Sequence, residues 1–162
     1  MVVSVMMYNC SSWAVTDKVL NQLDVCQRKH LRQILKIKWP TRITNEKLYD
    51  ICATTPLSSR VKASRWKMFG HILRGPENAP AALALNYAVV GCKNLPTRGR
   101  GNHKTSLLST IRKDISRIPV DLLSNTTELH QKLKLNNQHD IDVMRRLAHD
   151  RKMWKRLFYY VV

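Results

Sequence analysis

The 162-residue chain has few residues that turn a backbone, with only 5 glycines and 6 prolines. An all-β fold needs many tight turns, and these two residue types supply most of them. No segment shows the clear alternation of apolar and polar residues that is typical of a half-buried strand. These absences favour an all-α fold.

Acidic residues are also scarce, since 11 Asp and Glu stand against 28 Lys and Arg. Two-metal polymerases and nucleases need clustered carboxylates, but the acids here are scattered. The one close pair, Asp140 and Asp142, falls at a predicted helix start, where carboxylates favour the helix dipole. The chain also has no Gly-rich phosphate loop and no Gly-x-Ser-x-Gly nucleophile motif. We therefore expect no enzyme activity and no cofactor.

Metal-binding and membrane signals are missing as well. The four cysteines Cys10, Cys26, Cys52 and Cys92 are irregularly spaced, and no second ligand pair accompanies Cys92 and His103 as a zinc site would require. Irregular spacing is typical of reduced, partly buried thiols. No apolar run is long enough to cross a bilayer. We expect an intracellular protein of the nucleus or cytoplasm, with no metal and no membrane span.

Positive charge is the strongest signal that remains, with a net charge of +17. A fold gains nothing from such an excess, because like charges repel in the compact state. Binding to a polyanionic partner would explain the excess of positive charge, and nucleic acid is the leading candidate. An anionic membrane surface and a small ribosomal-type role are alternatives. Between Ile51 and Lys113 there are 11 basic residues and one acid, so we expect the phosphate contacts in this section.

Apolar residues recur at helical spacing over most of the chain. Predicted helices cover residues 16–38, 44–52, 57–74, 79–89, 104–118 and 140–159, with another short one within 121–137. Thr16 is the expected N-cap of the first helix, and Trp39-Pro40 is its expected end. The apolar face expected for that helix comprises Val19, Leu23, Cys26, His30, Ile34 and Ile37.

This pattern predicts six to seven helices in one compact irregular bundle. An alternative arrangement has two lobes, residues 1–90 and 104–162, joined by a basic loop at residues 91–103. That loop holds most of the glycines in the chain, and a bound phosphate backbone would offset the entropy cost of ordering it.

Basic side chains on shared helix faces are the candidate phosphate contacts. Arg60, Lys67 and Arg74 recur every seven residues along helix 57–74, a stripe about 20 Å long at the helical rise. Such a stripe suits a phosphate backbone, and an ordinary solvated face is the alternative. Further candidates lie on the first helix and in or beside the basic loop: Arg28, Arg32, Lys36, Arg98, Arg100 and Lys104.

Several segments together form a familiar ordered series. The sharpest, residues 65–74, reads Arg-Trp-Lys-Met-Phe-Gly-His-Ile-Leu-Arg, and it is preceded by Leu-Arg-Gln-Ile-Leu-Lys-Ile-Lys-Trp at residues 31–39. The series begins with Tyr8 and Trp13 and closes with Leu-Ala-His-Asp-Arg-Lys-Met-Trp at residues 147–154. In order and spacing it resembles the C-terminal, post-palm region of non-LTR (LINE-type) retrotransposon endonuclease–reverse transcriptases.

The resemblance runs from Tyr8 to about Phe158, with departures. Asn9 and Ser12 replace the glycine and glutamate of the opening motif, and Gly101 replaces the proline of the Gly-Arg-Pro loop. Neither the polymerase palm nor the endonuclease domain is present. The resemblance therefore implies a truncated copy that cannot copy RNA by itself.

For function, the resemblance implies a thumb or linker module that holds template RNA and target DNA. Its partners would be RNA, DNA and the polymerase part of the same element's protein. Among matching positions, Arg65, Arg74, Arg98 and Arg100 are the expected phosphate contacts, since a guanidinium meets phosphate bidentately. Trp66 is a candidate for stacking on an unpaired base, with core packing as the alternative.

Two other functions stay open on sequence alone. In the first, the chain is a degenerate structural fragment whose apolar surface once packed against the palm. In the other, residues 45–74 form a helix-turn-helix that reads duplex DNA.

Overall fold

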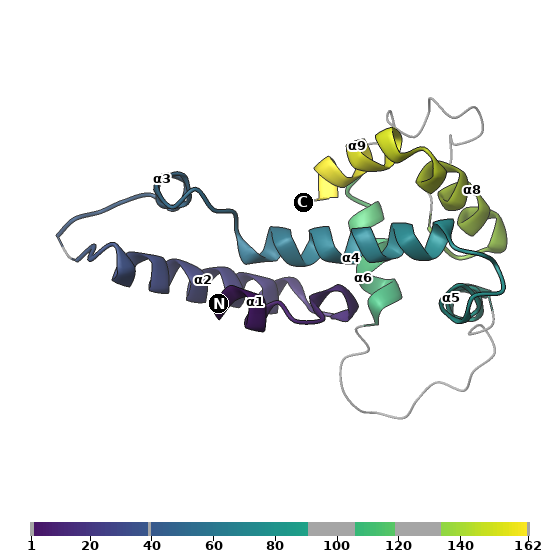
Figure 1. Cartoon of the computed structure of the whole chain (residues 1–162), viewed down its shortest axis with the longest axis horizontal. Coiled ribbons are helices and arrows are strands. Elements are labelled where there is room, and N and C mark those ends of the chain that lie inside the picture. Colours follow the sequence, from purple (N-terminus) through teal and green to yellow (C-terminus); the bar gives the residue numbers. More distant parts are fainter. Residues whose placement is uncertain (1, 39, 91–105, 119–133, 162) are drawn as a thin grey trace.

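The computed structural model describes residues 2–38, 40–90, 106–118 and 134–161. These ranges contain eight α-helices, one 3-10 helix and no strand, so the predicted all-α fold is confirmed. The elements are α1 (Val2–Met6), η1 (Cys10–Ser12), α2 (Asp17–Ile34), α3 (Asn45–Ile51), α4 (Leu57–Arg74), α5 (Pro80–Val90), α6 (Leu107–Ile115), α8 (Gln138–His149) and α9 (Arg151–Val161) (Figure 1).

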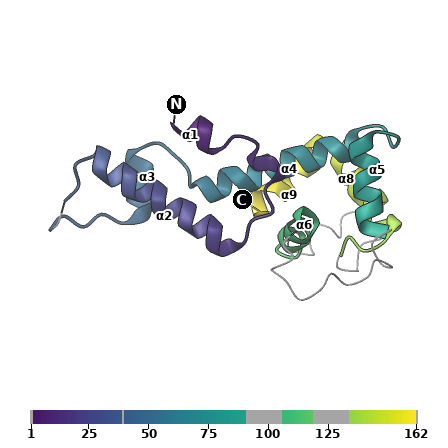
Figure 2. The same ribbon diagram turned by 90° about the horizontal axis from the view of Figure 1, so that it is seen from below.

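Helix α4 is the central element and has the bounds that its apolar periodicity predicts. α2 runs antiparallel beside the first half of α4, and both views of the ribbon show the two helices side by side (Figures 1 and 2). η1 also packs on α4, whereas α3 packs on α2. The second half of α4 is covered by α5, α8 and α9.

The main hydrophobic core surrounds this second half of α4. Trp66, Phe69 and Leu73 are buried together with apolar side chains of α5, α6, α8 and α9. Residues on either side of positions 91–105 therefore share one core. The rings of Trp66 and Trp154 have centroids 5.1 Å apart. Trp66 is fully buried. It therefore packs in the core, as the alternative assignment held, and it is not available to stack on a base.

Trp154 of α9 packs directly against Gly70 of α4. A Cβ atom at this position would lie 2.6 Å from Nε1 and 2.8 Å from Cε2 of Trp154. Both distances are shorter than van der Waals contact, so a glycine is needed here for close helix packing.

Replacing Gly70 with alanine is expected to lower the free energy of unfolding by about 1–3 kcal/mol, the usual cost of overpacking. At an open helical position the same change would raise it by up to about 1 kcal/mol through helix propensity. Urea unfolding followed by circular dichroism measures the difference, with exposed His71→Ala as the neighbouring control. A higher unfolding midpoint for Gly70→Ala would contradict this packing.

α2 begins as predicted but ends early. The Thr16 side chain accepts a hydrogen bond from the Val19 N–H, as an N-cap does. The helix stops at Ile34, and Lys36 adopts a left-handed backbone with φ 53°. The predicted end at Trp39-Pro40 was therefore wrong, and Trp39 itself lies outside the described residues.

The buried face of α2 also differs from the predicted one. Ile34, which we expected in the core, is 74% exposed, and His30 is exposed as well. Leu20 and Gln27 are the buried residues instead. The face is turned because α2 presents polar side chains to the start of α4.

Two polar residues of α2 satisfy the first N–H groups of α4, which Pro56 at the N-cap position cannot do through a side chain. Gln27 Oε1 accepts from the Leu57 N–H at 3.0 Å, while its Nε2 donates to the Thr55 carbonyl at 3.1 Å. Asp24 accepts from the Ser58 N–H at 2.9 Å. The cap of α4 is thus supplied by another helix.

Gln27→Ala is expected to lower the free energy of unfolding by about 1–3 kcal/mol, because it leaves the buried Leu57 N–H without a partner. Chemical unfolding measures the loss. Gln33→Ala, on the same helix and exposed, is the matched control and should change stability by less than about 0.5 kcal/mol. Equal effects of the two substitutions would argue against the cap.

The C-terminal helix is broken in two. A single helix over residues 140–159 was predicted, but α8 and α9 are separated at Asp150, whose ψ of 96° is extended. The carboxylate of Asp150 accepts the N–H groups of Lys152 at 2.9 Å and Met153 at 3.1 Å, so it caps α9. The break turns α9 back across α4 (Figure 1).

Candidate nucleic-acid interface

A pocket of about 590 Å³ lies between α4 and α9. Among the described residues it is lined by Lys67, Arg74, Arg151, Trp154 and Lys155, and its lining is mostly apolar. We call it the α4–α9 pocket. Four of its five side chains end in a cationic group, and the fifth is the indole that packs into the core.

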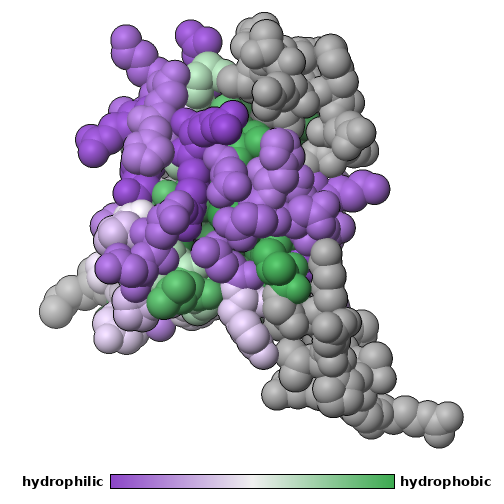
Figure 3. Space-filling view, turned by 90° about the vertical axis from the view of Figure 1, so that its right-hand side faces the viewer, coloured by the Kyte–Doolittle hydropathy of each residue, from purple (hydrophilic) through white to green (hydrophobic). Residues whose placement is uncertain are grey.

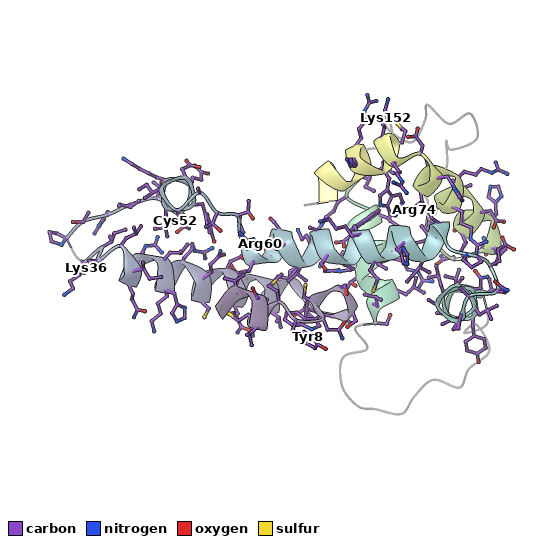
Figure 4. All side chains as sticks on the ribbon, in the orientation of Figure 1. Tyr8, Lys36, Cys52, Arg60, Arg74 and Lys152 are labelled. Carbon is purple, nitrogen blue, oxygen red and sulfur yellow. The ribbon has the colours of Figure 1, made fainter. Side chains whose placement is uncertain are left out.

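Helical spacing on two elements brings these cations together. Lys67 and Arg74 are seven residues apart, so they share one face of α4. Arg151 and Lys155 are four apart in the first turns of α9, again on one face. Figure 4 shows Arg74 at the end of α4 beneath α9, while Lys152 projects from α9 on the side away from α4. The cap at Asp150 sets the direction of α9 and therefore the position of its two cations.

The charge on the pocket is not neutralised by the protein groups described. Arg74 Nη1 donates to the Ala148 carbonyl at 3.1 Å, a bond that fixes the side chain and leaves its charge in place. Among the described residues, the ion pairs are made by other cations, such as Lys113 with Asp17 and Arg145 with Glu77. A concave, mostly apolar wall concentrates the field of unpaired cations. The described lining of the pocket therefore carries a net positive charge.

Only part of the predicted stripe on α4 reaches this pocket. Lys67 and Arg74 line it, but Arg60 lies at the opposite end of the helix (Figure 4). Its guanidinium donates to the hydroxyls of Thr54 and Thr55, so it fixes the turn before α4. Arg60 is therefore not among the residues that line the pocket with Lys67 and Arg74.

The candidates on α2 form a separate group at the far end of the molecule. Arg32 donates to Asn45 Oδ1 at 2.8 Å, and Arg28 contacts the Tyr49 hydroxyl at 3.5 Å, so both hold α3 against α2. Lys36 is exposed beyond the end of α2 (Figure 4). These side chains are distant from the α4–α9 pocket.

Arg65 is corrected from a phosphate contact to a core residue. It is 2% exposed, and its Nη1 lies 3.2 Å from the Asp114 carboxylate. The Trp66 indole N–H donates to the same carboxylate oxygen at 3.3 Å. Burial raises the pKa of Asp114, against the opposing effects of Arg65 and Trp66. The pair joins α6 to α4 and holds the Arg65 guanidinium in the interior.

Two further groups of residues bear on the predicted site. The loop candidates Arg98, Arg100 and Lys104, like Cys92 and His103, lie outside the described residues. Arg151 and Lys155 were not predicted as contacts, although their spacing of four along an amphipathic segment was a usable signal.

Comparison with known proteins supplies no relative: no protein-family model, curated protein or solved structure matches the chain. Within the described ranges, no helix combines the length and apolarity needed to cross a membrane. In the same part of the chain, no three His, Cys, Asp or Glu side chains gather as metal ligands.

Proposed function

We propose that the chain binds the sugar-phosphate backbone of RNA or DNA through the α4–α9 pocket, as a non-catalytic module similar to the post-palm region of a non-LTR retrotransposon reverse transcriptase. One observation carries the proposal: Lys67, Arg74, Arg151 and Lys155 converge on one concave surface, and none forms an ion pair within the described residues. The net charge of +17 adds long-range attraction to the same partner.

The proposal is tested by the salt dependence of binding. Each phosphate neutralised releases counterions, so the logarithm of affinity falls with the logarithm of salt by about 0.7 per contact on a single strand and 0.9 on a duplex. Four engaged cations predict a slope of about −3 for a single strand. Fluorescence anisotropy with labelled RNA, single-stranded DNA and duplex DNA gives the slope. A flat slope, or no binding at low salt, would exclude the proposal.

A second candidate is a structural fragment that docks on another part of a larger assembly. Leu83, Tyr87 and Val90 recur along one side of α5 and are all exposed. The end of the molecule that carries α5 and α8 is otherwise largely hydrophilic, with small apolar patches (Figure 3). A broad, non-cooperative thermal transition of the isolated chain would favour this candidate, and a sharp transition would argue against it.

The helix-turn-helix alternative has less support. In that motif the two helices pack on each other, and the second enters the major groove. Here α3 packs on α2, while Leu57 and Val61 in the first turns of α4 are buried. α3 and α4 each pack on α2, and the close mutual packing that defines the motif is not seen between them.

A further inference from the structure

The lining of the α4–α9 pocket differs from that of a simple backbone-binding groove. A surface that contacts only phosphates needs cations and polar donors, but most of this lining is apolar. Trp154 and the aliphatic stems of the lysine and arginine side chains supply apolar atoms next to the charged groups. Apolar surface next to cations matches a ligand that carries both a phosphate and an apolar face.

An unpaired nucleotide is such a ligand. In a duplex the faces of the bases are stacked inside the helix, so an outside surface meets mainly phosphate and sugar. In a single strand each base offers an apolar face that a protein can cover. The pocket volume of about 590 Å³ falls in the range of small-molecule sites of this kind, roughly 300–1,000 Å³.

The cations are placed to hold the flanking phosphates. Lys67 and Arg74 approach the pocket from α4, while Arg151 and Lys155 approach from α9, so positive groups stand on two sides of the apolar lining. Trp154 is 6% exposed and its ring packs against Trp66, which leaves little of it open to the pocket. The base would thus be covered by the small exposed part of Trp154 and by aliphatic stems, without a full stacking platform.

We infer that the α4–α9 pocket takes an unpaired nucleotide, so that the protein prefers single-stranded nucleic acid to duplex. This inference rests on the proposed function and adds to it the strand class and the contact with the base. Single strands of RNA and of DNA both carry phosphates and uncovered bases. Testing both kinds of strand shows which sugar is preferred.

The test compares three labelled ligands of equal length with the full chain at one salt concentration: a single strand, a strand whose middle nucleotides are abasic, and a duplex. The single strand is expected to bind about tenfold tighter than the abasic strand and tighter than the duplex, because a covered base contributes in the range known for base contacts. RNA and DNA versions of the first two ligands separate the sugar from the base. Equal affinity for normal and abasic strands, with the steep salt slope retained, would overturn the inference and leave the proposed function intact. Failure of every ligand to bind at low salt would overturn both.

The location is tested with a single strand carrying 5-bromouracil, which cross-links on irradiation to nearby aromatic and other electron-rich side chains. Mass spectrometry of the digested complex is expected to find the cross-link on the peptide that contains Trp154. Cross-links confined to peptides of α2 and α3 would place the strand elsewhere and contradict the inference. The unchanged chain is used throughout, so misfolding of a variant cannot confuse the result.

Discussion

Replacing Arg151 and Lys155 with glutamine is expected to weaken the binding of a single strand by about 25-fold at 0.1 M salt. The estimate assumes that two phosphate contacts are lost, at about 0.7 each in the log-log slope, and that the loss disappears near 1 M salt. Anisotropy titrations at several salt concentrations measure both quantities. The slope should become less steep by about 1.4.

The control for this prediction removes the same charge from a different surface. Lys18 and Lys29 are exposed on α2, outside the α4–α9 pocket, so Lys18→Gln with Lys29→Gln also lowers the net charge by two. If the pocket holds the backbone, this control keeps most of the affinity and nearly all of the slope. Equal weakening by the two double variants would mean that net charge, and no particular site, attracts the partner.

The second large effect is expected from the buried ion pair between α4 and α6. Asp114→Ala leaves the Arg65 guanidinium buried without its counter-charge, and such a change costs about 3–5 kcal/mol. Arg65 Nε and Nη2 have no hydrogen-bond partner within the described residues, so in that part of the chain Asp114 is the carboxylate that pairs with this guanidinium. Urea unfolding of the variant measures the loss.

Two further variants decide whether the cost comes from the unpaired charge. Arg65→Met with Asp114→Asn removes both charges and keeps an acceptor for the Trp66 indole, so its stability should return to within about 1 kcal/mol of the parent. Lys113→Ala breaks the pair with Asp17, in which both side chains are more than half exposed, and should cost at most about 1 kcal/mol. A loss for Asp114→Ala no larger than that for Lys113→Ala would contradict the importance of the buried pair.

Local sequence signals predicted the helices well where local interactions determine them. Thr16 and Thr44 each accept an N–H three residues on, and α4 has the predicted bounds because proline precedes it and Gly75-Pro76 follows. The buried face of α2 could not be predicted from such local signals. Gln27 and Asp24 are polar, and their partners lie some 30 residues away along the chain, at the start of α4.

Only two of the four cations that line the described part of the pocket were predicted, for a similar reason. Spacing along one helix identified Lys67 and Arg74. Arg151 and Lys155 were missed because an unbroken helix was expected. The break depends on Asp150, which is itself extended and caps the new helix. Arg65 was misassigned because its acid partner is on another helix, 49 residues away.

The retrotransposon-like motifs coincide largely with residues that hold the helices together. Arg65 pairs with α6, Gly70 admits Trp154, and Asp150 caps α9. Leu147 and Ala148 are buried in the same core. Many motif residues thus build the scaffold, while Arg74 and Arg151, which belong to the same motifs, line the α4–α9 pocket with Lys67 and Lys155. The resemblance to the retrotransposon proteins is therefore supported by residues that pack the helices together. The proposed binding of nucleic acid is supported by the cations of the α4–α9 pocket.

Lysine footprinting tests the central claim most directly. An amine-reactive reagent is applied to the free chain and to the chain saturated with a single strand, and mass spectrometry quantifies the labelling of each lysine. Lys67 and Lys155 should lose most of their reactivity on binding, whereas Lys18 and Lys29 should keep theirs. If Lys67 and Lys155 stayed fully reactive in the saturated complex, the α4–α9 pocket would not be where nucleic acid binds.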